Sequence, residues 1–131
     1  MVSTSIKKYR NANAESVVDA SPHQLISLIL RHILSNIAIA TGAIARKEIE
    51  SKGKSISKAI ALVGELQDSL DMEKGGEVSQ NLFNLYEYIV RTLIEANLDS
   101  NVDKLEEVRD LIATIKEGWD AIPVEMRVKP A

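Results

Sequence analysis

The chain has 131 residues, of which 45% are hydrophobic and 27% charged, a composition typical of one soluble globular domain and not of a disordered chain. It contains no cysteine, which excludes disulfides and thiolate metal ligands and is compatible with a reducing compartment. The net charge of −3, without a basic stripe, argues against nucleic acid as a partner, because such binding depends on neutralising phosphates.

The first 20 residues show no sustained hydrophobic period, and they predict an N-terminal arm that is loosely attached to the domain. They also lack the basic region, apolar run and small-residue cleavage site of a secretory signal. The most apolar stretch, residues 25–45, is interrupted by Arg31, His32 and two further polar residues. A helix spanning lipid would have to bury those groups, so we expect no stable membrane insertion.

A strong helix start follows the arm. Ser21 can cap the helix, Pro22 suits the first helical position, and Gln24 completes a capping box with Ser21. The apolar pattern that follows predicts that this first helix runs from Pro22 to about Lys47.

Three further helices are predicted, each separated from the last by a turn signal. Residues 51–54, which include Gly53, predict the first turn, and apolar residues at helical spacing predict a second helix after it. The pair Gly75-Gly76 predicts a break before a third helix over about 77–97. Residues 99–101 predict the next turn, and Pro123 predicts the end of the fourth helix.

Four helices joined by short turns predict an all-α fold, an antiparallel up-down four-helix bundle. We expect an arm over 1–20, the bundle over 21–122 and a mobile C-terminal tail over 123–131. The apolar faces of the first and third helices are wider than the stripe of roughly 100° that a bundle helix needs. Either these two helices are the most enclosed ones, or part of their surface is kept for a partner.

The sequence offers little material for catalysis or metal binding. Its two histidines, His23 and His32, are nine residues apart, and neither follows a glutamate by three, as helical di-metal sites require. We therefore expect no metal, no cofactor and no enzymatic activity. We expect His23 to be a solvated first-turn residue and His32 to be partly buried. Histidine phosphotransfer domains are also small acidic four-helix bundles, so phosphotransfer through His32 is one alternative function, and a generic helical adaptor is another.

From Ile6 to Trp119, the order and spacing of several segments resemble those of the flagellar secretion chaperone family FliS. The matching segments are Ile6 and Tyr9, Glu15-Ser16-Val17-Val18, Ala20-Ser21-Pro22-His23-Gln24-Leu25, Ser57-Lys58-Ala59-Ile60, Leu70-Asp71-Met72-Glu73-Lys74-Gly75-Gly76-Glu77, Asn81-Leu82, Leu85-Tyr86-Glu87-Tyr88-Ile89-Val90-Arg91, Leu93, Glu95-Ala96-Asn97-Leu98, Glu106-Glu107-Val108 and Trp119. One departure follows the first apolar run of the first helix, where the family usually has an aromatic, an acid and a glycine. This chain has Leu30, Arg31 and His32 there.

The resemblance implies a non-enzymatic chaperone in the bacterial cytosol that binds the disordered C-terminal segment of flagellin and prevents its premature polymerisation. It also implies that the complex is handed to the flagellar type III export apparatus at the export gate, FlhA. By the same resemblance, the arm lies against the bundle and influences the binding groove. The expected partner-binding residues are Ile6 and Tyr9 in the arm, with Leu28, Ile29, Ile33, Ile56, Ile60 and Tyr86 in the bundle. As an alternative, Leu28, Ile29, Ile33, Ile56 and Ile60 can each be a residue of the hydrophobic core.

Overall fold

A computed structural model describes residues 21–127 of the chain, so the predicted arm and residues 128–131 lie outside the described part. The elements in chain order are α3 (Pro22–Ala45), α4 (Ile49–Asp68), α5 (Met72–Asp99), α6 (Val102–Asp120) and a short 3-10 turn, η1 (Val124–Met126). The described range contains no strand. The predicted all-α class is therefore confirmed, whereas the division into arm, bundle and tail stays a prediction.

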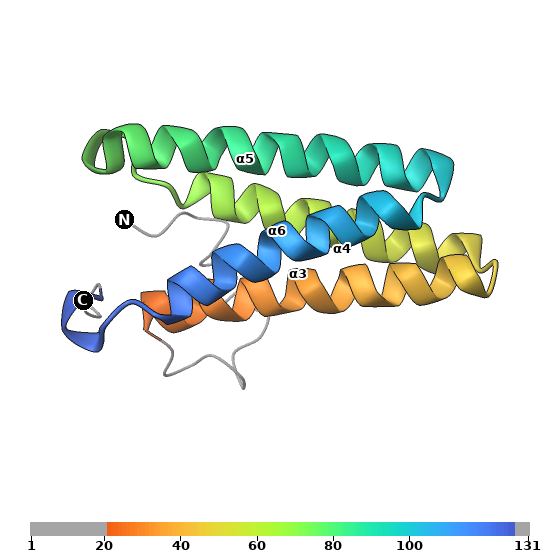
Figure 1. The fold of residues 1–131 in the computed structure, drawn as a ribbon, viewed down its shortest axis with the longest axis horizontal. Helices are drawn as coiled ribbons and strands as arrows, with labels where there is room; N and C mark the ends of the chain where they lie inside the picture. The colour runs from red at the N-terminus through yellow and green to blue at the C-terminus, as the bar shows by residue number, and fades with distance from the viewer. Residues whose placement is uncertain (1–20, 128–131) are drawn as a thin grey trace.

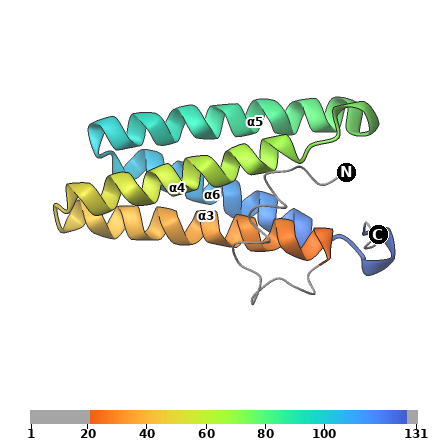
Figure 2. The same ribbon diagram turned by 180° about the vertical axis from the view of Figure 1, so that it is seen from behind.

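The four long helices pack as one antiparallel bundle. In Figure 1, α5 and α3 lie at opposite sides, and α6 crosses obliquely in front of the space between them. Figure 2 shows α4 crossing on the opposite face of the bundle. Each helix thus packs on two neighbours: α3 and α5 both contact α4 and α6, and the α3–α4 interface is the most extensive. The predicted four-helix bundle is confirmed.

Local capping explains where two of the helices begin. At the start of α3, the hydroxyl of Ser21 accepts a hydrogen bond from the backbone N–H of Gln24 at 3.1 Å, and the Gln24 side chain accepts one from the Ser21 N–H at 2.9 Å. This is the predicted capping box. At the start of α6, the side chain of Asn101 accepts from the backbone N–H of Lys104 at 3.2 Å. Both predicted starts are confirmed.

The predicted turn at residues 51–54 is wrong, because the chain turns earlier, between α3 and α4. Lys47 adopts a left-handed conformation with φ of 58°, and the N–H of Glu48 donates to the carbonyl of Ala43 at 2.8 Å. Gly53 lies inside α4. A helix tolerates one interior glycine at a cost of about 1 kcal/mol, which the packing of α4 against its neighbours outweighs. α3 ends at Ala45, slightly before the predicted end.

The glycine pair does break the third helix, but one helical turn precedes the break. α5 begins at Met72, and Gly76 interrupts it with φ of 51° and ψ of −125°. The side chain of Asp71 caps the turn before Gly76 by accepting from the N–H of Lys74 at 2.9 Å. Only glycine adopts the Gly76 conformation without strain, so the predicted break is confirmed while the predicted start at Glu77 is wrong.

One hydrophobic core runs along the bundle axis, with Leu, Ile, Val and Ala from all four helices. Fully burying each Leu or Ile contributes ~1.5–3 kcal/mol. Within the described residues, α3 is the one helix long and apolar enough to cross a membrane by length and composition. Eight of its residues are buried, and α3 packs on both α4 and α6. The buried part of its apolar surface therefore belongs to the bundle core.

Candidate partner-binding surface

Three of the residues expected to bind a partner lie inside the bundle. Ile29 and Ile33 on α3 and Ile56 on α4 have no exposed surface and belong to the core cluster. In this structure they occupy the core positions that the sequence left as an alternative.

Tyr86 on α5 is also enclosed, with 5% of its surface exposed. Burial of the phenol disfavours its charged form and raises the pKa of Tyr86 to about 12. Its ring therefore contributes to the core. The arm residues Ile6 and Tyr9 lie outside the described residues.

Leu28 and Ile60 are half-buried, but the structure does not bring them together. Leu28 lies on the flank of α3 that is turned away from His23 and Ser27, the two residues that bond to α6. It therefore lies toward α4. Ile60 lies on the other flank of α4, which faces α5. The two side chains belong to different seams, a seam being the line along which two helices meet.

The α4–α5 seam carries an apolar strip at the surface. Two bonds set its register: the Lys52 ammonium donates to the carbonyl of Asn97 at 2.9 Å, and the Gln67 amide donates to the carbonyl of Phe83 at 3.2 Å. Ile60, midway between Lys52 and Gln67, therefore lies opposite Val90. We define the α4–α5 strip as Gly53, Ile60 and Gly64 of α4 with Phe83, Val90 and Ile94 of α5.

The strip consists of apolar side chains that are exposed or half-buried, beside two glycines of α4 that have no side chain. Ile94 is 47% exposed, while Phe83, Val90 and Ile60 are half-buried. A Cβ atom added at Gly64 would meet nothing within 4 Å, and one added at Gly53 would meet only the Asn97 amide oxygen at 4.0 Å. The surface of α4 is therefore open beside the apolar residues of α5. The strip is therefore a candidate site for another protein.

The sequence prediction names Ile60 as a partner-binding residue and does not name the other members of the strip. The wide apolar face of the third helix was visible in the spacing of Phe83, Val90 and Ile94. That spacing does not tell which neighbouring helix lies beside each flank. The sequence prediction treats Gly53 as a turn signal and does not use Gly64. The spacing of both glycines from Ile60 nevertheless places all three residues on one flank of α4.

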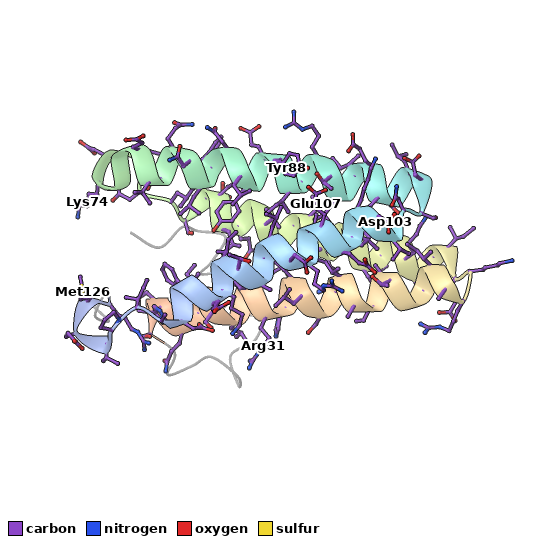
Figure 3. The ribbon with its side chains drawn as sticks, in the orientation of Figure 1. Arg31, Lys74, Tyr88, Asp103, Glu107 and Met126 are labelled. Atoms are coloured by element: carbon purple, nitrogen blue, oxygen red, sulfur yellow. The ribbon has the colours of Figure 1, made fainter. Side chains whose placement is uncertain are left out.

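The α5–α6 seam, by contrast, is bridged by polar bonds. The Tyr88 hydroxyl of α5 donates to the Glu107 carboxylate of α6 at 2.5 Å, and Figure 3 shows these two side chains facing each other. That bond to an anion raises the pKa of Tyr88. The Lys104 ammonium lies 3.5 Å from a carboxylate oxygen of Glu95 and 3.7 Å from one of Asp99. Polar side chains, most of them acidic, therefore bridge this seam.

His23 is not the solvated residue that the sequence predicts, because only 6% of its surface is exposed. Its ring stacks on Trp119 with centroids 4.8 Å apart. The Nε2 atom of His23 lies 2.7 Å from the carbonyl oxygen of Trp119, and the indole N–H donates to the carbonyl of His23 at 2.9 Å. The pair thus fastens the start of α3 to the end of α6, and His23 has a structural role.

His32 is half-buried, as the sequence predicts. Burial, followed by the positive charge of Arg31, lowers the pKa of His32, so its neutral form is favoured at pH 7. Among residues 21–127, no three His, Asp or Glu side chains gather in a group that could hold a metal ion.

The fold defines a class of protein, the antiparallel four-helix bundle, and the α4–α5 strip is its candidate surface for another polypeptide. The particular family follows from comparison with known sequences. Residues 5–126 match the family model of the flagellar protein FliS, and the chain belongs to that family.

Curated relatives agree with this assignment. The chain is 43% identical to the flagellar secretion chaperone FliSB of Pseudomonas aeruginosa, over 89% of this chain and 94% of that protein. It is 40% identical to the flagellar secretion chaperone FliS of Salmonella typhimurium, over 89% and 88% of the two chains. FliS of Vibrio cholerae is 30% identical over 92% of this chain. The relatives are chaperones, a non-enzymatic class, so this chain is a flagellar export chaperone by family and is not an enzyme.

Proposed function

We propose that this chain is a cytoplasmic export chaperone that binds the disordered C-terminal segment of flagellin. Binding keeps flagellin subunits from polymerising early, and the complex is then handed to the flagellar type III export apparatus at the gate FlhA. Membership of the FliS family and the name of the relatives, flagellar secretion chaperone, support this proposal. The alternative of phosphotransfer through His32 has no support from the family or from the half-buried position of that side chain.

The observation that carries the proposal is the α4–α5 strip. A disordered segment can form an amphipathic helix whose apolar anchors lie along such a surface. Gly53 and Gly64 let the backbone of that helix come close to α4, while Ile60, Val90 and Ile94 supply apolar contacts. Part of the contact energy is used to order the segment, which keeps release feasible.

The remaining expected residues have supporting places in this proposal. Leu28 of α3 is half-buried on the flank that lies toward α4, and it contacts a second, extended part of the wrapped segment. Ile29, Ile33 and Ile56 hold the helices that carry the surface, because they fill the core beneath it. The arm, with Ile6 and Tyr9, lies against the bundle and influences access to the binding surface.

Isothermal titration calorimetry with a flagellin C-terminal peptide tests the proposal. We expect binding with a strongly negative heat-capacity change, because apolar surface is buried as the peptide folds. Replacing Ile94→Asp places a charge on the strip and is expected to weaken binding at least about tenfold, comparable to the loss of one interface anchor. Val124→Asp is the control: Val124 of η1 is an exposed apolar residue that lies outside the strip and outside the α3–α4 seam.

The outcomes separate three readings. Loss of affinity in Ile94→Asp alone, with unchanged helicity, supports the strip as the binding surface. Equal affinity of both variants and the native chain for the peptide would show that flagellin binds another surface of the chaperone. No heat and no shift of the peptide on a sizing column would refute flagellin as the partner and favour a generic adaptor.

A further inference from the structure

A pocket lies at the end of the bundle where the α3–α4 turn meets the α5–α6 turn. Its volume is about 270 Å³, enough for one amino-acid side chain. The lining residues come from α3, the turn, α4 and the residue that follows α5: Ala43, Ile44, Lys47, Glu48, Ile49, Lys52 and Ser100. The surface that faces the pocket is almost wholly apolar, with aliphatic side chains at Ala43, Ile44 and Ile49.

Lys52 is a buried cation whose described hydrogen-bond partners are neutral. Only 8% of its surface is exposed. Its ammonium donates to the carbonyl of Asn97 at 2.9 Å and to the hydroxyl of Ser100 at 2.7 Å, and neither acceptor carries a formal charge. An ammonium has three donors, so one remains for a further acceptor. A buried charge gains most when an anion compensates it.

The start of α4 adds a second source of positive potential on the same wall. Glu48 occupies the capping position but makes no capping bond with its side chain. The first backbone N–H groups of a 20-residue helix are therefore left without a side-chain cap, and they favour an anion. The carboxylate of Glu48 is itself paired with the Arg46 guanidinium at 2.9 Å, so its own charge is partly balanced.

The pocket lies at one end of the α4–α5 strip. Gly53 of the strip directly follows Lys52, and Ile94 lies on the last part of α5 before Ser100. Figure 1 shows the α3–α4 and α5–α6 turns at the same end of the bundle. A helix lying on the strip and running parallel to α5 would therefore end at this pocket.

We propose that this pocket receives the last side chain of the bound flagellin segment, against Ile44 and Ile49, and that the terminal α-carboxylate of the segment lies at the rim of the pocket beside Lys52 and the start of α4. This inference rests on the proposed function, in which the cargo is a C-terminal segment and so ends in a free carboxylate. The C-terminal end of a helix also carries partial negative charge, which the start of α4 and the Lys52 ammonium both attract. The carboxylate thus fixes the direction of the segment on the chaperone.

The test compares two synthetic forms of the flagellin C-terminal peptide, one ending in a free acid and one in an amide. The native chaperone is expected to bind the acid at least about fivefold more tightly, because a charge-assisted bond is lost in the amide. Lys52→Met keeps the aliphatic stem and is expected to bring the two affinities together. Lys54→Met is the matched control: Lys54 is exposed, lies two positions along the same helix and does not line the pocket.

Equal affinity of the native chaperone for acid and amide would overturn the pocket proposal while leaving flagellin binding intact. Failure of both peptides to bind would instead refute the proposed function, and the pocket proposal with it. Lys52 also bonds to Asn97 and Ser100 at the end of α5, so Lys52→Met can fail to fold. The Lys52 side-chain ¹⁵N signal of the native protein provides a second readout, expected to shift with the acid and not with the amide.

Discussion

Glu65 on α4 carries a carboxylate oxygen, Oε2, that is buried and receives no hydrogen bond. Burial, followed by the negative charge of Asp68, raises the pKa of Glu65 above its ordinary value. The folded protein therefore holds this proton more tightly than the unfolded chain does. The contribution of Glu65 to stability is fully present below the pKa of the unfolded chain, and it is lost as the pH rises through the pKa of the folded protein.

Glu65→Gln is accordingly expected to stabilise the protein at pH 7, because it removes the desolvated charge. The gain in the free energy of unfolding is about 1 kcal/mol or less, since the side chain is partly solvated. The gain should shrink below about pH 4, where the native carboxyl is protonated. Urea unfolding at both pH values measures it. Glu87→Gln on the exposed face of α5 is the control, and a loss of stability for Glu65→Gln at pH 7 would contradict the argument.

At this scale, the sequence predicts what depends on near neighbours and misses what depends on packing. The Ser21–Gln24 capping box joins residues three apart, and its residue types alone indicate it. The stacking of His23 on Trp119 joins residues 96 positions apart. No local sequence pattern contains that contact. The sequence therefore predicts a solvated His23, because it lies in the first turn of a helix.

The start of α5 depends on glycine for space as well as for conformation. A Cβ atom at Gly75 would lie 1.7 Å from the Ser79 hydroxyl oxygen and 2.7 Å from the Ser79 Cβ. The Ser79 side chain is 7% exposed and donates to the carbonyl of Asp71 at 2.9 Å, which ties the first turn of α5 to the rest of the helix. The turn therefore has no room for a side chain at Gly75.

Gly75→Ala is expected to destabilise the protein by ~1–3 kcal/mol, because Ser79 must move and its bond to Asp71 is lost. Gly64→Ala is the contrasting variant. A Cβ atom there meets nothing within 4 Å, so the better helix propensity of alanine should stabilise α4 by ~0.5–1 kcal/mol. Thermal unfolding followed by circular dichroism measures both changes. Similar shifts of the two variants would show that space at Gly75 does not matter.

At the scale of elements, the existence of four helices followed from apolar spacing, but their ends did not all follow. Gly53 and the Gly75-Gly76 pair look alike as helix breakers, yet only Gly76 leaves helical geometry. Packing of α4 on its neighbours overrides the weak propensity of one glycine. The spacing likewise shows that the third helix is apolar over a wide arc, but only the arrangement of α4 beside α5 turns that arc into a strip.

At the scale of the molecule, the core is one continuous cluster to which all four helices contribute. The ends of the chain's described helices are also tied together, because the His23–Trp119 pair joins the start of α3 to the end of α6. Trp119 is the single tryptophan of the sequence. Its fluorescence therefore reports on one end of the bundle, whereas far-ultraviolet circular dichroism reports on all four helices.

One shared core predicts that the bundle unfolds as one cooperative unit. The urea transitions followed by Trp119 fluorescence and by circular dichroism at 222 nm should therefore coincide, as expected for a two-state domain of this size. Trp119→Phe removes the indole hydrogen bond to His23 but keeps an aromatic ring, so it should lower the circular-dichroism midpoint without splitting the transition. A fluorescence transition at clearly lower urea than the loss of helicity would show instead that α3 and α6 separate first. The bundle would then consist of two units, with the α3–α4 pair, which shares the most extensive interface, unfolding last.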